Sequence, residues 1–249
     1  TRLFPTNKRL RPVGVFAVLI FDVAQLSGLL ALTGGLTNPF CILLVVPVII
    51  SATTLPPRFT ATLAAITLAF TTLYLGLGYM VAESTKEKAR EELVAKEYPK
   101  IERMRAMPTF ANLLLWRIVA KDEQGDIHVG MVSRVAPNDV PFQTIKRTES
   151  PLVDKTMKDE RAQIFHWFAD EYIHWRIEEQ PTETHVFMDD MRYGGIREPA
   201  KAMWSAKATY TKGKDEKLLD VTRTQRRPSD PGAEFGELWR MIWEGTEKK

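Results

Sequence analysis

The chain has 249 residues, of which 26% are charged, and a formal net charge of +3 at neutral pH. No basic stretch carries interleaved aromatic side chains, so the sequence gives no support to nucleic acid as a partner. The single cysteine, Cys41, excludes an internal disulfide, a CxxC zinc site and a dithiol redox pair. These averages hide a sharp division, because from Pro12 to Ala82 the only charged side chains are Asp22 and Arg58.

Three apolar segments within residues 12–82 predict a membrane anchor. They run from about Val13 to Leu32, from about Pro39 to Leu55 and from about Phe59 to Ala82. A helix needs about 20 apolar residues to cross a hydrocarbon core, and it pairs every backbone polar group internally. We therefore expect three spans, with the alternative that the second and third segments form one broken helix.

Basic residues predict the orientation of the spans. The first span follows four of them, Arg2, Lys8, Arg9 and Arg11, and Arg58 lies between the second and third segments. Positive residues favour the cytoplasmic side. With three spans, we expect the N-terminus in the cytoplasm and everything after Ala82 in the periplasm, at a bacterial inner membrane. Two spans would place the second part in the cytoplasm.

Two polar side chains, Asp22 and Gln25, lie one helical turn apart in the first span and so share a face. A carboxylate at membrane depth costs about 3 kcal/mol and usually faces a protein interior or a cavity. Two interpretations are open. Asp22 makes a polar contact between helices, with Gln25, Thr53 or Thr54 as its partner, or it is a protonatable group beside a bound ligand.

The link between the first two segments reads Gly34-Gly35-Leu36-Thr37-Asn38-Pro39-Phe40. Glycine adopts positive φ without steric cost and Pro39 suits the first turn of a helix, so we expect a tight re-entry turn. The link also places the hydrogen-bonding side chains of Thr37 and Asn38 beside the ring of Phe40 at the membrane interface. These groups suit a flat ligand that carries carbonyl groups, such as a quinone.

The residues Phe21-Asp22, Gln25-Leu26, 32–40 and 52–54 resemble the middle membrane spans of the RegB/PrrB family of redox-sensing histidine kinases. The resemblance covers roughly residues 8–75. In that family the GGxxNPF motif is linked to ubiquinone sensing. The resemblance therefore implies ubiquinone as a cofactor, held by Asp22, Gln25, Thr37, Asn38 and Phe40. The chain lacks a phosphoacceptor-histidine box and nucleotide-binding glycine motifs, so kinase activity is not implied.

Almost all of the charge of the chain lies after Ala82. Residues 83–107 are rich in Lys, Glu, Arg and Ala, which favours a solvated connecting helix that Pro108 stops. Strands are expected over roughly 112–120, 127–135, 172–177, 184–188, 203–211 and 217–222, and helices over 154–169 and 234–243. Residues 108–249 should then form an α+β domain with one antiparallel sheet of five or six strands, with most of the six tryptophans packed in its core.

Two motifs of this domain carry a second resemblance: Pro108-Thr109 with residues 112–119 (NLLLWRIV), and later residues 190–194 (DMRYG). In this order they resemble the C-terminal domain of the bacterial membrane-bound metal-dependent hydrolase family, the YdjM-like group, from about Leu73 onward. The resemblance implies a structural motif made of Trp116, Arg117, Asp190, Arg192, Tyr193 and Gly194. That family's presumed metal ligands lie among its spans, whereas this chain has no histidine before His128.

No HExxH motif and no close pair of metal ligands occurs in the sequence. Asp189, Asp190 and Arg192 form the sharpest polar cluster, which suits an ion pair at a strand end or, alternatively, a catalytic carboxylate pair. We therefore expect no metal and a non-catalytic periplasmic domain that binds a partner or braces a larger membrane complex at the lipid bilayer. The alternatives are a quinone-responsive membrane element and a membrane-bound metal-dependent hydrolase.

Overall fold

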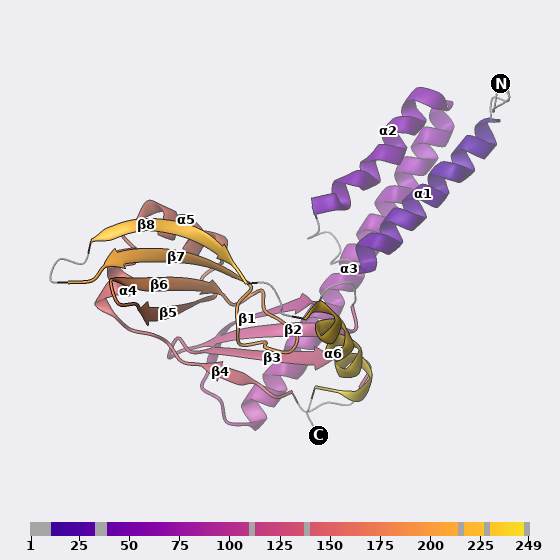
Figure 1. The fold of residues 1–249 in the computed structure, drawn as a ribbon. Helices are drawn as coiled ribbons and strands as arrows, with labels where there is room; N and C mark the ends of the chain where they lie inside the picture. Colours follow the sequence, from indigo (N-terminus) through magenta and orange to yellow (C-terminus); the bar gives the residue numbers. More distant parts are fainter. Residues whose placement is uncertain are drawn as a thin grey trace. The chain divides into compact units, whose positions relative to one another are not determined.

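The computed structural model describes residues 11–32, 39–109, 113–136, 140–213, 217–226 and 230–246, with only the backbone described at 30–32, 39–41, 74 and 75. The chain divides into two compact units. The first, or helical, unit holds Thr1–Ala82 with Pro108–Leu113, and the second, or polar, unit holds Glu83–Met107 with Leu114–Lys249. Figure 1 shows helices in the first unit and two β-sheets in the second.

The helical unit contains α1 (Pro12–Leu32), the 3-10 helix η2 (Pro39–Leu44), α2 (Val45–Thr54) and the first part of α3 (Pro57–Ala95). Its small core joins Leu19 and Val23 of α1 to Leu55 and Leu63, and all four side chains are buried. Most other large apolar side chains of these helices are exposed, as expected for surfaces that face lipid.

Two of these helices, over Pro12–Leu29 and Pro57–Ala95, contain stretches long and apolar enough to cross a membrane. The apolar helix Ile42–Thr54 is shorter, so the second of the three expected spans remains a prediction. The structure also differs from the alternative in which the second and third apolar segments form one broken helix. Leu55 is extended, and Val45 and Val48 of α2 line the same groove as Ala64 and Leu68 of α3, so the two helices lie side by side.

Helix α3 continues beyond its apolar stretch to Ala95, so its last turns belong to the polar unit. The connecting helix expected over residues 83–107 is wrong in its second half, because residues 101–108 form a strand. Glu97 has a positive φ of 57° and Pro99 lacks the N–H that a helical bond requires. These two residues end the helix early.

The first sheet contains, in spatial order, β1 (Ile101–Pro108), β2 (Leu115–Asp122), β3 (Ile127–Ser133) and β4 (Gln143–Ile145). Side chains alternate between its two faces. On one face, Ile118 and Val132 pack against Ala89 of α3. On the other, Leu115 and Met131 pack against the C-terminal helix α6 (Pro231–Glu244), which Figure 1 shows beside β2 and β3.

The second sheet contains β5 (Ile173–Glu179), β6 (Glu183–Asp190), β7 (Trp204–Thr211) and β8 (Leu218–Gln225), each antiparallel to the next. Helices α4 (Pro151–Thr156) and α5 (Glu160–Phe168) cover its apolar face, where Met188 and Ala206 pack against Ala162. The opposite face carries polar side chains. One covered face and one polar face is the usual arrangement of an antiparallel sheet.

The expected single sheet of five or six strands is thus two sheets of four. Strands β1 and β4 were absent from the prediction. The single helix expected over 154–169 is two helices, α4 and α5. They lie between β4 and β5 in the sequence. Each sheet pairs strands that are neighbours in sequence. Strand periodicity cannot reveal such a division, because a meander of eight strands and two meanders of four share the same local pattern.

The tryptophans also differ from the prediction of core packing. Trp116 is buried, but Trp167, Trp239 and Trp243 are 81%, 50% and 58% exposed. Trp167 lies on α5 and the other two lie on α6. An amphipathic helix buries only the side of its surface that meets the sheet, so aromatic residues on the other side stay in contact with solvent or a further surface.

Candidate ligand-binding site

A row of polar side chains crosses the open face of the second sheet. His174 of β5 is the cross-strand partner of Asp189 in β6, which pairs in turn with Ser205 of β7, and Ser205 pairs with Thr224 of β8. Cross-strand partners project from the same face, about 5 Å apart. The sheet therefore brings together four polar residues that are distant in sequence.

This row forms the floor of an open cavity of about 570 Å³. Its walls come from β4, β5–β8 and the loop before β7, with the lining residues Ile145, His174, Arg176, Phe187, Asp189, Ala200, Lys201, Ala202, Ser205, Thr224, Gln225 and Arg226. Cavities of this size with a few convergent polar groups are typical of ligand sites. All these residues belong to the polar unit.

Asp189 is the best-held group of the cavity. Its carboxylate accepts hydrogen bonds from Nε of Arg176 at 3.0 Å and from Oγ of Ser205, and the residue is buried. Arg176 also pairs with Glu178 and lies over the ring of Phe187, with its guanidinium carbon 4.0 Å from the ring centroid. These contacts fix the directions of a carboxylate, a guanidinium and an aromatic ring before any ligand arrives.

His174 completes the row as a neutral imidazole. Burial lowers its pKa below the ordinary value of 6.5, while the nearby Asp189 carboxylate opposes that change and the Arg176 cation reinforces it. The half-buried imidazole would lose part of its hydration in the charged form, which explains the direction. At neutral pH this side chain can both donate and accept a hydrogen bond within the cavity.

The neighbouring carboxylate, Asp190, points to the other face of β6 because successive strand residues alternate. It is buried and forms a two-bond ion pair with Arg192, at 2.9 Å to Nε and 2.7 Å to Nη2. The cluster of Asp189, Asp190 and Arg192 is therefore divided in space. The two carboxylates lie on opposite faces, so the alternative of a catalytic carboxylate pair is wrong.

Arg117 of β2 joins the two predicted motifs of the domain. This buried residue donates from Nε and Nη2 to the carbonyl of Met191, at 3.2 and 2.8 Å, and from Nη2 to that of Pro199 at 2.7 Å. Burial lowers its pKa to about 10, which the Asp190 carboxylate partly opposes. Two further residues of the expected structural motif differ in exposure, since Trp116 is buried and Tyr193 is exposed.

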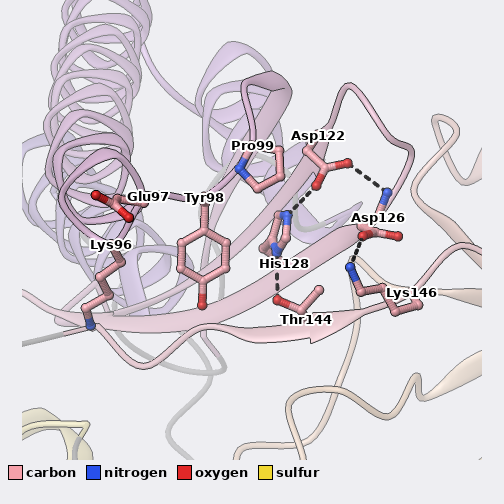
Figure 2. Close-up of a pocket in the computed structure, with 9 residues that line it drawn as sticks. All are labelled: Lys96, Glu97, Tyr98, Pro99, Asp122, Asp126, His128, Thr144 and Lys146. Carbon is pink, nitrogen blue, oxygen red and sulfur yellow. Dashed lines mark hydrogen bonds and ion pairs between the residues drawn. The ribbon is translucent and has the colours of Figure 1, made fainter.

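A second, smaller cavity of about 260 Å³ lies at the β2–β3 hairpin (Figure 2). Nε2 of His128 lies 2.9 Å from Oδ2 of Asp122, and Nδ1 lies 3.0 Å from Oγ1 of Thr144. Asp122 and His128 are buried, whereas Thr144 is exposed on the edge strand β4. A carboxylate that orients an imidazole beside a hydroxyl is an arrangement able to activate that hydroxyl.

The same carboxylate holds the hairpin turn, because Oδ1 of Asp122 accepts from the backbone N–H groups of Gln124 and Asp126, each at 2.9 Å. Asp126 pairs with Lys146 at 2.6 Å. Burial raises the pKa of Asp126, but hydrogen bonds from Lys146 and the Arg147 backbone outweigh it, so the pKa lies below its usual value. Figure 2 shows both carboxylates at the same turn.

Sequence reasoning missed both cavities. The hairpin network had a local signal in Asp122-Glu123-Gln124-Gly125-Asp126, a turn with two carboxylates close to His128. The polar row on the second sheet had no local sequence signal, because its members come from four strands. Among the described residues, no group of three or more His, Cys, Asp or Glu side chains is arranged to hold a metal ion. The described residues therefore do not fit the metal that the hydrolase resemblance implies.

Comparisons with known proteins match the N-terminal part of the chain, which includes the helical unit. Residues 3–98 match the PilS-like transmembrane domain family. Over 87 residues the chain is 44% identical to the sensor histidine kinase RegB of Cereibacter sphaeroides. The matched segment is 34% of this chain and 19% of that kinase. No solved structure matches the chain. The chain is an integral protein of the bacterial inner membrane.

This likeness agrees with the resemblance that the sequence showed to RegB-type membrane spans. Of the residues expected to bind quinone, Asp22 is half-buried and Gln25 is exposed on α1. Phe40 lies in η2, where only the backbone is described, and Thr37 and Asn38 lie outside the described residues. Thr53 and Thr54 each donate to the carbonyl of Ile50 in their own helix.

Proposed function

We propose that this chain is a membrane-anchored binding protein whose second sheet receives a polar segment of a partner protein in the cavity above His174, Asp189 and Ser205. The observation that carries this proposal is the row of fixed donors and acceptors on the open sheet face. The spans would hold this surface at the inner membrane, where it binds one partner or braces a larger complex.

The charges around the cavity indicate the kind of segment that fits. Arg176 is paired with Asp189 and Glu178, while Lys201 and Arg226 are both paired with Glu198. The cations are therefore largely balanced by neighbouring carboxylates. A mixed surface of this kind favours a segment with both donors and acceptors over a strongly charged anion, and it gives specificity more than affinity.

The proposed side of the membrane is the periplasm. Arg11 before the first span and Arg58 between the second and third segments support a cytoplasmic location for both positions. A crossing by α2 as well as by α1 and α3 would then bring the polar unit to the opposite side. A cysteine introduced at the exposed Leu219, after replacement of Cys41 by Ser, should react with a membrane-impermeant maleimide in intact spheroplasts.

Site-specific photocross-linking in cells tests the binding proposal. A benzoyl-phenylalanine at Phe187, in the cavity, should yield one discrete protein adduct, and Arg176→Gln in the same chain should abolish it. The same cross-linker at the exposed Trp167, on α5 over the other face, is the matched control. A monodisperse lone chain without an adduct from Phe187 would refute the proposal.

A quinone-responsive membrane element is a second candidate, supported by the 44% identity of the span region to the sensor histidine kinase RegB. Under this proposal the residues Asp22, Gln25, Thr37, Asn38 and Phe40 contact ubiquinone. Asn38→Ala and Phe40→Ala should then lower the quinone that copurifies with the chain. Thr62→Val is the control, since its hydroxyl donates to the carbonyl of Arg58 in its own helix. Unchanged quinone content in both loop variants would count against this candidate.

Hydrolysis is a third candidate, supported by the hydrolase resemblance and by the contacts of Asp122, His128 and Thr144. Thr144→Val should remove any ester hydrolysis and leave the fold intact, because the side chain is exposed. Activity that survives this change would exclude Thr144 as the nucleophile. A purified chain without bound zinc, iron or manganese would count against the metal-dependent form of this proposal.

A further inference from the structure

Helix α6 exposes three aromatic side chains in a line. Phe235, Trp239 and Trp243 follow one another at intervals of four residues and are 56%, 50% and 58% exposed. Their ring centroids are 6.2 Å and 6.1 Å apart along the line. We call these three side chains the aromatic ridge. A contiguous aromatic surface of this kind marks a contact with another apolar phase or molecule.

The opposite side of α6 is firmly held, so the ridge has a fixed direction. Leu238, Met241 and Ile242 are buried against the first sheet. Oγ of Ser133, at the end of β3, donates to the carbonyl of Ile242 at 2.8 Å. Asp230 caps the start of the helix by accepting from the Ala233 N–H at 3.0 Å. The ridge is therefore a rigid surface and not a set of loose side chains.

The ridge lies at the end of the polar unit that is tethered to the bilayer. Ser133, which holds α6, is the strand partner of Leu115 at the start of β2. The α3 segment packs along the other face of the same sheet. Its Ala89 contacts Ile118 in the middle of β2.

The direction of that α3 segment along the sheet follows from the position of its C-terminal end. Tyr98, just after the helix, lies edge-on to His128, with ring centroids 4.9 Å apart. His128 pairs with Ala120, near the far end of β2. The chain thus approaches the Leu115 end of the sheet as it is followed back to Glu83, directly after the apolar stretch. Helix α6 and the point of membrane exit share one end of the polar unit.

The charges of α6 do not favour attraction of this helix to anionic lipid. The helix carries Glu234, Glu237 and Glu244 against the single cation Arg240. Arg240 forms a two-bond pair with Glu237, at 3.0 Å and 2.8 Å. A contact through this helix must therefore come from its aromatic rings, which favour the level of the lipid headgroups.

We infer that the aromatic ridge of α6 inserts into the headgroup layer of the bilayer that anchors this chain. Helix α6 is then an interfacial helix, and it holds the first sheet against the membrane surface. The occupant of the ridge is lipid, because the surface is aromatic, lacks net positive charge and lies at the tethered end of its unit. This inference does not depend on the cavity of the second sheet.

Quenching of tryptophan fluorescence by brominated lipid tests this inference on the full chain. All six tryptophans lie at or after Trp116, so the apolar spans contribute no signal. The chain is placed in nanodiscs of phosphatidylcholine with bromine near the headgroup end of the acyl chains. If the six residues emit equally, insertion of Trp239 and Trp243 should quench about a third of the emission.

The double change Trp239→Ser and Trp243→Ser should remove most of this quenching. Trp167→Ser is the matched control, since this more exposed residue lies on α5 over the second sheet and should leave the quenching unchanged. Adding anionic phosphatidylglycerol should not increase the effect. Circular dichroism of each variant checks that the fold is retained.

Three results would overturn the inference. The first is an unquenched parent chain, and the second is equal quenching in the double variant and the parent. The third is blue-shifted but unquenched emission from the ridge, which would show that a protein partner or a second copy covers it. The photocross-link at Phe187 reports on a different surface, so either proposal can fail without the other.

Discussion

Nη2 of Arg117 and the α-carbon of Gly194 lie so close that a side chain at position 194 has no room. A Cβ built on Gly194 would lie 2.6 Å from Nη2 and 2.8 Å from Nη1 of Arg117. The guanidinium is itself held by the carbonyls of Met191 and Pro199. The residue pair thus connects the first sheet to the segment after β6, and it explains why a glycine stands there.

Gly194→Ala should lower the free energy of unfolding by about 2 kcal/mol, because the buried Arg117 cannot move away without losing its carbonyl partners. Thermal unfolding of the detergent-solubilised chain measures this change. Gly236→Ala in α6 is the control. Its added methyl group meets nothing within 4 Å, and alanine favours a helix, so stability should rise slightly. A Gly194→Ala chain as stable as the parent would contradict the close contact.

Asp190→Asn should cost about 3 kcal/mol, because it leaves the buried guanidinium of Arg192 without its carboxylate. Asp189→Asn should cost less, since its partner Arg176 is 40% exposed and keeps Glu178, but it should abolish the photocross-link from Phe187. Denaturant unfolding and cross-linking of the two variants, side by side, measure these effects. Equal losses of stability in the two would contradict the division of the carboxylates between opposite faces.

The stability of the polar unit should fall as the pH drops below about 6.5, the ordinary pKa of histidine. His174 has a lowered pKa in the folded chain, so unfolding takes up a proton in this window. The stabilisation is present above the unfolded pKa and is lost as the pH falls through the folded one. His166, whose pKa burial also lowers, adds a contribution of the same sign.

Unfolding temperatures measured between pH 5 and pH 7.5 check this expectation; the range brackets the ordinary pKa of about 6.5. In a His174→Asn variant the slope of stability against pH should be smaller than in the parent. An unchanged slope would show that His174 is not protonated on unfolding in this range.

Asp122→Ala should lower the free energy of unfolding by about 3 kcal/mol, because two backbone N–H groups of the hairpin and the buried His128 lose their acceptor. Thr144→Val should cost less than about 1 kcal/mol, since the threonine is exposed and water can replace it. Denaturant unfolding compares the two. A larger loss for Thr144→Val would mean that the edge strand, rather than the turn, holds this network.

Several features of this protein were determined locally and could be predicted from the sequence. The apolar segment from Pro12 to Ala82, with two charged residues, differs sharply from the charged remainder of the chain. Helices α1 and α3 follow from the length of its apolar runs. The turn at Asp122 to Asp126 and the strands on either side follow from alternation and from Gly125, whose φ is +83°. The terminal helix was expected over 234–243 and extends over Pro231–Glu244.

Other features depend on contacts between residues far apart in the chain. The sequence showed Asp189 and Asp190 as one cluster, but strand geometry turns them to opposite faces, one beside Arg176 and the other beside Arg192. The polar row of the second sheet likewise joins residues from four strands in one register. Such outcomes are set by long-range pairing, which no local window contains.

The sequence by itself determined which segments are apolar, which are charged and where the chain turns, because these depend on side-chain chemistry and on neighbours within a few residues. Only the tertiary structure decided that eight strands form two sheets, that His174, Asp189 and Ser205 share one row, and that Trp239 and Trp243 face outward. Those facts depend on which surfaces cover one another, and burial is a property of the assembled fold.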